Sequence, residues 1–568
     1  MKFSRIFVEY IFAILAIFFV SCAVFGAFKT YSPTLYLDMW DGYLDFYVRV
    51  SAGDWSAWRN QHNEHRIALA HILFWIDITF FKAHLWFLIL SNYILLITIC
   101  VLFLHIWHVK TNKKMISVEF FIIIWLFSWI QFENLASPFQ SEFFLAYLLP
   151  LAAFYLIHLS IADKNRSLLY FISASILAFL SSETMANGII VLPMLTLFSI
   201  LGLCNWRRTI FLTILSLFSL WLFFDGYVFG KYLSGQIIQA NPINFFKYIL
   251  YYIGGPFLYI TQNKTWSLWV AQFFGVILIY GVINFSWHFF KKQNRSSLDL
   301  VLLFFIAYIG ASAAITASGR LFFGAEQAFA SRYMTPALMM WLTFAMLHSD
   351  YVIANIKKVT LLSSILIIGL IPSQLTVFES KRDIFYERSI AVLALELRIK
   401  DSEQLKAVYP HPAGDANSNA DRILLLSKVP TEQNLSVFGA YPWKNLKERL
   451  GQNVAKLDVP IEKCLGHFDK TIAIEDDARF VRVEGWIWDP ISLSTPEVLT
   501  LIDKQSNEIV GFALPGYSRS DITTGLGKNS HRVGFKGYLL SEKKNLPMLF
   551  VGENMKCTLP SEVFLGIN

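Results

Sequence analysis

Residues 7–28 read FVEYIFAILAIFFVSCAVFGAF, and this apolar stretch determines how the rest of the chain is interpreted. Its length matches the roughly 20 apolar residues that an α-helix needs to cross a bilayer. The stretch is longer than the apolar core of a typical signal peptide, and it lacks a clear small-residue cleavage site. We therefore expect the chain to begin with an uncleaved membrane anchor.

The composition extends this interpretation to the whole chain. Hydrophobic residues make up 55% of the 568 positions and charged residues 16%, whereas soluble domains carry about 25% charged residues. Phe occurs 52 times and Trp 17 times, as expected where aromatic side chains face lipid and the bilayer interface. The net charge of +7 does not indicate nucleic-acid binding, because Lys and Arg occur in short clusters between apolar runs. The sequence predicts an all-α polytopic membrane domain.

Eleven apolar runs are candidates for membrane-spanning helices. They lie near residues 7–28, 85–107, 116–132, 142–161, 167–182, 187–204, 209–229, 267–290, 298–317, 335–349 and 359–377. The run at 67–81 is shorter and contains Asp77, so we expect an interfacial or re-entrant helix there. Another apolar run is interrupted by Gly-Gly-Pro at residues 254–256, where proline should break a helix.

Basic clusters between the apolar runs indicate the orientation of the chain. The clusters are Lys2 with Arg5, Lys110 with Lys113 and Lys114, Lys164 with Arg166, Arg207 with Arg208, Lys291 with Lys292 and Arg295, and Lys357 with Lys358. Cytoplasmic loops carry an excess of Lys and Arg. With the N-terminus inside and eleven spans, every cluster falls on the cytoplasmic face, and the C-terminal part lies on the outer face.

This topology divides the chain into three parts. We expect a transmembrane domain over residues 1–378, in which the first external loop covers about 29–84. Residues 379–465 have a mixed, mainly helical pattern, and residues 466–568 form a β-domain. The C-terminal part is therefore predicted as a periplasmic α/β region that ends in a small β-sandwich, which would serve as an accessory domain.

The β-domain is recognised by short alternating runs. Residues 480–488 and 498–502 alternate apolar and polar positions between segments rich in Gly, Pro, Asn and Asp, which predicts a small antiparallel β-sandwich or barrel. Cys464 and Cys557 bracket this domain. We expect them to form a disulfide, because the outer face of the membrane is an oxidising compartment.

The first external loop holds candidate catalytic and binding residues. Residues 36–45 read YLDMWDGYLD and include Asp38, Trp40 and Asp41. Residues 61–66 read QHNEHR and include Glu64, His65 and Arg66. A loop that needed only solvation would require few aromatic residues. Carboxylates beside aromatic rings suit sugars, whose C–H faces stack on rings while their hydroxyls bond to carboxylates.

Further polar residues lie on the same predicted face. The candidates are Glu133, Glu183, Asn187, Arg320, Glu326, Arg332 and Tyr333. Polar groups at membrane depth are costly and are candidates for function. The planar fork of an arginine suits a phosphate group, although Arg320 and Arg332 could instead bind lipid headgroups. A lipid-phosphate-linked sugar fits such a set, with a carboxylate to accept a proton from the attacking hydroxyl.

The overall layout resembles a known superfamily. An acidic residue just after the first span, interfacial helices, eleven spans and an external C-terminal domain look like the GT-C superfamily of polyprenyl-phosphate-sugar glycosyltransferases. Two large external regions resemble the phage- and island-encoded glucosyltransferases that modify bacterial O-antigen, part of lipopolysaccharide. The resemblance implies an inverting transfer of a hexose such as glucose to a periplasmic glycan, by an enzyme of the bacterial inner membrane.

The resemblance also implies residue roles. Asp38 and Asp41 both match the catalytic base of the first external loop, and Asp41 is preferred. Glu64 and Glu183 are the next candidates for this base. Arg332, and less so Arg320, would bind the donor phosphate. Residues expected to contact sugar or acceptor are Trp40, Glu64, His65, Arg66, Glu133, Glu183, Asn187, Glu326 and Tyr333. The Trp-Trp-Asp signature of oligosaccharyltransferases is absent, so we expect no metal or other cofactor.

Two alternatives stay open at this stage. An O-antigen polymerase or ligase is also polytopic with periplasmic arginines, but its large external loop would come late in the chain. A lipid flippase or transporter would show internal repeats and broken helices at the midplane, and the sequence shows neither.

Overall fold

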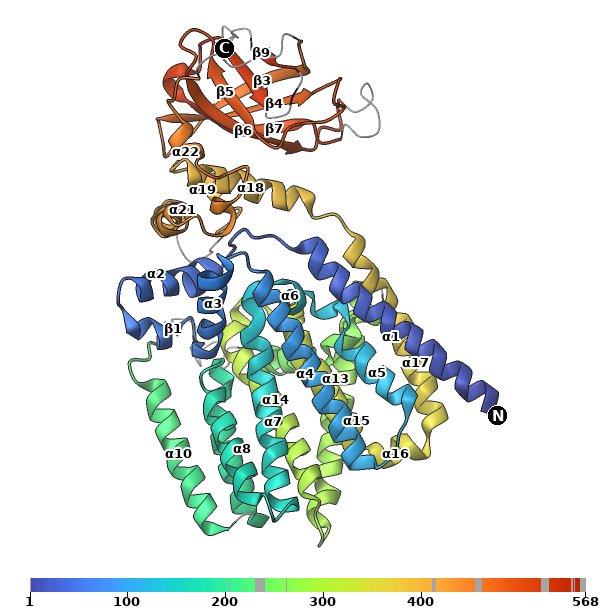
Figure 1. The fold of residues 1–568 in the computed structure, drawn as a ribbon. Coiled ribbons are helices and arrows are strands. Elements are labelled where there is room, and N and C mark those ends of the chain that lie inside the picture. Colours follow the sequence, from blue (N-terminus) through green and yellow to red (C-terminus); the bar gives the residue numbers. More distant parts are fainter. Residues whose placement is uncertain are drawn as a thin grey trace. The chain divides into compact units, whose positions relative to one another are not determined.

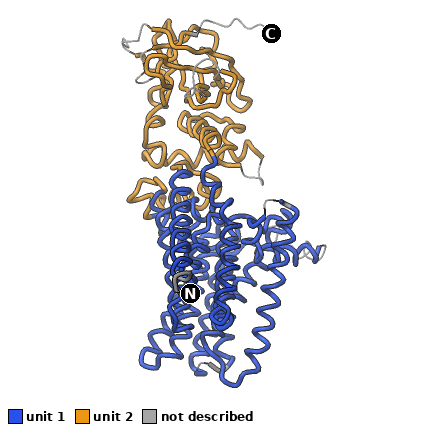
Figure 2. The backbone as a smooth tube through the Cα atoms, turned by 90° about the vertical axis from the view of Figure 1, so that its right-hand side faces the viewer, with its two compact units in different colours: residues 1–31, 55–75, 86–379 blue, residues 32–54, 76–85, 380–568 orange. Residues whose placement is uncertain are grey.

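The computed structural model describes residues 2–203, 205–229, 241–261, 263–410, 415–454, 462–522, 531–552, 555 and 557–561. Its contacts divide the chain into two compact units (Figure 2). Unit 1 comprises residues 1–31, 55–75 and 86–379, and unit 2 comprises residues 32–54, 76–85 and 380–568. Two segments of the predicted first loop thus belong to the same unit as the C-terminal part of the chain.

Unit 1 is a bundle of apolar helices (Figure 1). Within the described residues, eight helical segments are long and apolar enough to cross a membrane. They contain α1 (Lys2–Thr30), α4 (Trp86–Thr111), α5 (Ile116–Leu126) with α6 (Phe132–Ala136), α7 (Ser141–Ala162), α10 (Trp206–Phe224), α13 (Lys264–Lys291), α14 (Ser297–Arg320) and α17 (Ile356–Leu375). The chain is therefore a multi-pass membrane protein by the length and composition of its helices, as predicted.

Three of the eleven predicted spans contain shorter helices. Helix α8 (Ser167–Ser181) has 15 residues, α9 (Val191–Phe198) has 8 and α15 (Met334–Leu347) has 14. A span needs about 20 residues, so the described residues contain eight helical segments of that length, and the count of eleven spans stays a prediction. Residue 204, at the end of one predicted span, lies outside the described residues.

Of the two predicted irregularities, one coincides with a short helix and the other with the end of a helix. Helix α3 (Ala68–Phe81), the expected interfacial segment, has 14 residues, fewer than a span requires. Helix α12 (Pro242–Gly254) ends directly before Gly255, and a 3₁₀ helix, η7 (Gly255–Ile260), continues the chain. Pro256 lacks a backbone N–H and cannot continue an α-helical hydrogen-bond ladder, which explains the change at this point.

The ends of the helices that carry the basic clusters contact one another. Lys110 of α4 forms an ion pair with Asp299 of α14. Arg208 of α10 donates to Ser167 Oγ of α8 at 2.9 Å. These contacts gather several basic loops at one end of the bundle, where Figure 1 also shows α16 (Ser349–Ala354), while α6 lies at the opposite end. Such clustering is what the alternation of basic loops predicts.

Unit 2 combines short helices with the β-domain. Its helical elements are η1 (Met39–Leu44), α2 (Asp45–Ser51), α18 (Arg382–Glu396), α19 (Ser402–Leu405), α20 (Ala416–Leu426), α21 (Lys428–Glu432) and α22 (Leu446–Arg449). Backbone hydrogen bonds attach the first-loop segments to the C-terminal region: Leu37 N donates to Val408 O at 3.0 Å, and Ser436 N to Lys82 O at 2.8 Å.

The β-domain is one antiparallel sheet in the order β3-β4-β7-β6-β5-β8-β9. The strands are β3 (Leu465–Ala473), β4 (Phe480–Trp488), β5 (Leu499–Asp503), β6 (Ile509–Tyr517), β7 (Gly534–Leu540), β8 (Met548–Gly552) and β9 (Leu559–Ser561). A bridge from Lys463 to Thr558 and a disulfide between Cys464 and Cys557 join the two edges. Of the two predicted forms, the single closed sheet corresponds to a barrel, and the predicted disulfide is present.

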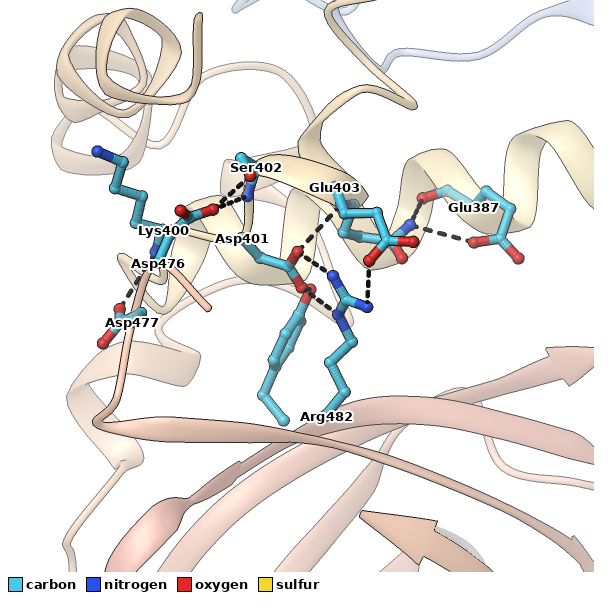
Figure 3. Close-up of polar contacts among 10 residues, drawn as sticks. Glu387, Lys400, Asp401, Ser402, Glu403, Asp476, Asp477 and Arg482 are labelled. Atoms are coloured by element: carbon cyan, nitrogen blue, oxygen red, sulfur yellow. Dashed lines mark hydrogen bonds and ion pairs between the residues drawn. The ribbon is translucent and has the colours of Figure 1, made fainter. Parts of the chain in front are cut away.

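A buried ion pair attaches the barrel to the helices of unit 2 (Figure 3). Arg482 of β4 donates to both carboxylate oxygens of Asp401, at 2.6 and 2.5 Å. The Tyr538 hydroxyl donates to the same carboxylate at 2.9 Å, and a third bond joins Arg482 to Glu403 at 2.8 Å. The side chain of Asp401 is 1% exposed, so this network fixes the barrel to the segment around α19.

Candidate functional site

Asp41 is held by two residues from the C-terminal part of the chain. It lies in the π-helical turn η1, and its Oδ1 accepts a hydrogen bond from Arg422 Nε at 2.6 Å. Its Oδ2 accepts from the Tyr409 hydroxyl, also at 2.6 Å. The Asp41 side chain keeps 22% of its surface exposed. Each carboxylate oxygen has two lone pairs, so Asp41 is oriented and can still accept a further hydrogen bond.

Asp38 has different surroundings. It is exposed, directly precedes η1, and its backbone carbonyl accepts from Gly42 N at 2.7 Å. Within the described ranges its carboxylate has no hydrogen bond or ion pair. The two aspartates of the first loop are therefore not equivalent, because one is positioned by neighbours and the other is free in solvent.

Buried contacts fix the turn that carries Asp41. The Tyr43 hydroxyl donates to Asp77 Oδ2 at 2.7 Å, and Leu85 N donates to the same oxygen at 3.3 Å. Tyr43 and Trp40 are 0% and 1% exposed. Trp40 was expected to contact sugar, but in this structure its ring is packed in the interior and supports the turn.

A cleft in unit 2 is lined in part by Tyr409, the residue that donates to Asp41. It has a volume of about 400 Å³, within the range of about 300–1,000 Å³ that is typical of ligand sites. Its walls include Ser402, Leu405, Lys406, Tyr409, Asn419 and Ile423. Lys406 is exposed at the cleft. Apolar walls with a few polar groups and one cation suit a polar ligand that also presents C–H surface.

The two arginine candidates lie in unit 1 and are each paired with a candidate carboxylate. Arg332 Nη1 lies 3.2 Å from Glu133 Oε2, and its guanidinium lies 5.1 Å from the centre of the Tyr333 ring. Arg320 Nη2 lies 3.1 Å from Glu64 Oε2. The two arginine side chains are 30% and 31% exposed, so each keeps part of its surface open.

Other candidates in unit 1 hold the structure together. The Arg66 side chain is 7% exposed and donates to the backbone carbonyls of Arg59, Phe223 and Asp225. Burial, together with His62 and Arg320, lowers the pKa of His65 to about 3. A neutral imidazole agrees with the 3.1 Å bond in which His65 Nδ1 accepts from Ala186 N. These contacts indicate that Arg66 and His65 position the loop.

Two of the remaining three candidates are held by hydrogen bonds, and the third is exposed. Glu183 accepts two hydrogen bonds from Arg59, at 3.1 and 2.8 Å. Asn187 donates to Ser312 Oγ at 3.1 Å, and Glu326 is exposed in η9 (Ala325–Phe329). Next to Asn187, Gly188 lies so close to Ser181 that an added Cβ would be 1.7 Å from its carbonyl oxygen. Glycine is therefore required there for the helix ends to meet.

Sequence reasoning did not identify Tyr409, Arg422 or Arg59 as site residues. Tyr409 and Arg422 are 368 and 381 residues from Asp41 in the chain. No local motif marks them, so the pairing is visible only once the chain is folded.

Comparison with known protein families, curated proteins and solved structures finds no match to this chain. Within the part of the chain that the structure describes, no group of three or more His, Cys, Asp or Glu residues is arranged to hold a metal ion. The expectation of a metal-independent reaction stays a prediction.

Proposed function

We propose that the protein is an inverting glycosyltransferase of the bacterial inner membrane. It would transfer a hexose from a polyprenyl-phosphate donor to a periplasmic glycan such as O-antigen. The observation that carries this proposal is the Asp41 carboxylate, which is oriented by two hydrogen bonds and still partly exposed. A positioned carboxylate of this kind is what a general base requires.

In the proposed reaction, an acceptor hydroxyl attacks the anomeric carbon of the donor sugar. Its proton passes to Asp41 as the new C–O bond forms. The bond between the anomeric carbon and the phosphate oxygen breaks, and polyprenyl phosphate leaves as an anion, so no general acid is needed. Attack on the face opposite the leaving group inverts the anomeric configuration.

Arg332 and Arg320 are proposed to bind the donor phosphate. Both are partly exposed and already hold carboxylates, Glu133 and Glu64. A phosphate offers oxygens of similar geometry and more charge, so it can replace a carboxylate at a guanidinium. The displaced glutamates, with the exposed Glu326, would then be available to sugar hydroxyls.

The acceptor is proposed to enter the cleft beside Tyr409. This tyrosine both lines the cleft and donates to Asp41. A saccharide in the cleft would therefore lie one side chain away from the base. The apolar wall would face the C–H surface of the sugar, and Lys406 would bind its oxygens.

Turnover of donor by the purified full-length protein tests the proposal. Polyprenyl-phosphate glucose labelled in the sugar is mixed with the protein in lipid nanodiscs and with O-antigen polysaccharide. A transferase moves the label to polysaccharide and releases polyprenyl phosphate. A flippase leaves the donor chemically intact, and a polymerase or ligase consumes lipid-linked oligosaccharide instead. Donor that stays intact under all acceptor conditions would contradict the proposal.

A further inference from the structure

Within unit 2, Asp41 of the first loop is bonded to two residues from the C-terminal part of the chain. Arg422 lies in α20 and Tyr409 follows α19, and both belong to unit 2 with Asp41. Together they occupy both oxygens of the carboxylate, at 2.6 Å each. Hydrogen bonds to an ionised acceptor are stronger and more directional than neutral ones. The orientation of Asp41 therefore depends on residues beyond position 400.

We propose that Arg422 and Tyr409 are positioning residues for Asp41, so that the C-terminal region completes the catalytic machinery. This inference rests on the proposed function, in which Asp41 is the base. Arg422 fixes Oδ1 through its Nε and Nη2 atoms, at 2.6 and 2.5 Å. Tyr409 fixes Oδ2, whose second lone pair can accept the proton of the acceptor hydroxyl.

The burial of the three side chains fits this division of roles. Tyr409 is 5% exposed and so cannot easily leave its place. Arg422 is 47% exposed, while Asp41 is 22% exposed. The buried Tyr409 hydroxyl therefore gives the Asp41 carboxylate a fixed partner, and Arg422 adds a charge-assisted bond. Burial, followed by the hydrogen bond to Asp41, raises the pKa of Tyr409, so this hydroxyl stays a donor at neutral pH.

Asp38 offers an internal comparison. It precedes the same turn by three positions but has no such partners in the described residues. If the orientation of the base limits the rate, Asp41, which is held by two partners, should act as the base, and Asp38 should contribute less to the rate. Both aspartates match the family resemblance, and the preference for Asp41 over Asp38 then has a physical basis.

The test compares four variants of the full-length protein in nanodiscs: Arg422→Gln, Arg422→Lys, Tyr409→Phe and the control Asp421→Asn. Asp421 is the neighbour of Arg422 on α20 and forms an exposed ion pair with Lys400 at 2.8 Å. Removing a charge-assisted bond from a reacting group should lower kcat about 10- to 100-fold. We expect this for Arg422→Gln, a smaller loss for Tyr409→Phe, partial recovery in Arg422→Lys, and no change in Asp421→Asn.

The kinetic constants separate positioning from a merely structural role. Positioning predicts that kcat falls while the KM for donor and the melting temperature stay near the wild-type values. Unchanged kcat in Arg422→Gln, or an equal fall in Asp421→Asn, would overturn the inference while leaving the proposed function intact. Absence of turnover by the wild-type protein would overturn both.

Discussion

The attachment of the barrel through Asp401 gives the most quantitative prediction for stability. In Asp401→Asn, a side chain that is 1% exposed loses its negative charge, and an NH2 group replaces one of the two oxygens that accept from Arg482; Tyr538 also loses an ionised acceptor. Breaking a buried ion pair by changing one partner typically costs about 3–5 kcal/mol. Arg482 keeps its 2.8 Å contact with Glu403, so we expect the lower end, about 3 kcal/mol.

Thermal unfolding of the full-length protein in detergent measures this loss. For a domain of about 200 residues, 3 kcal/mol corresponds to a fall of about 6–12 °C in the Tm of unit 2. The control is Asp421→Asn, which breaks the exposed pair with Lys400 and should cost less than about 1 kcal/mol. Equal shifts in the two variants would refute the conclusion that the Asp401 network fixes the barrel.

Three further predictions concern single residues. Cys464→Ser removes a cross-link between residues 93 apart in the chain and should destabilise the barrel by about 2–4 kcal/mol, measured by thermal unfolding, with thiol labelling of Cys557 as the check. Burial raises the pKa of Glu396 from 4.5 to about 7, so stability contributed by its neutral form is lost as pH rises from 4.5 to 7. Glu396→Gln should then raise the stability of unit 2 at pH 8, by up to about 3 kcal/mol, and change little at pH 4. Arg332→Lys keeps the charge but loses the fork that now contacts Glu133, so donor KM should rise at least about 10-fold; an unaltered KM would identify Arg332 as a headgroup anchor.

Much of the fold follows from the sequence because lipid imposes simple rules. Apolar runs of sufficient length predicted eight helices that the structure shows, and Gly254 ends α12 where a break was expected. Whether the three shorter helices also span stays a prediction, because hydropathy alone does not fix where a helix ends. Closure of the β-strands into one sheet depends on pairing between distant edges, near Lys463 and Thr558, which an alternating pattern does not specify.

Only the part of the candidate site that forms a local sequence pattern could be predicted. The acidic first loop is visible as a local pattern, but the partners of Asp41 lie hundreds of residues away and have no motif. Trp40 shows a second limit of a local pattern, since an aromatic residue beside a carboxylate looks the same in sequence whether its ring is buried or exposed. Only the fold shows that this ring is 1% exposed.

The central claim is that Asp41 accepts the proton of the acceptor hydroxyl. Single-turnover transfer of labelled hexose from polyprenyl phosphate to polysaccharide, measured for wild type, Asp41→Asn and Asp38→Asn in nanodiscs, tests it most directly. A positioned base contributes about 10²–10⁴-fold in rate, so Asp41→Asn should lose at least about 10²-fold while still binding donor, and Asp38→Asn should lose less. Full activity of Asp41→Asn would contradict the account.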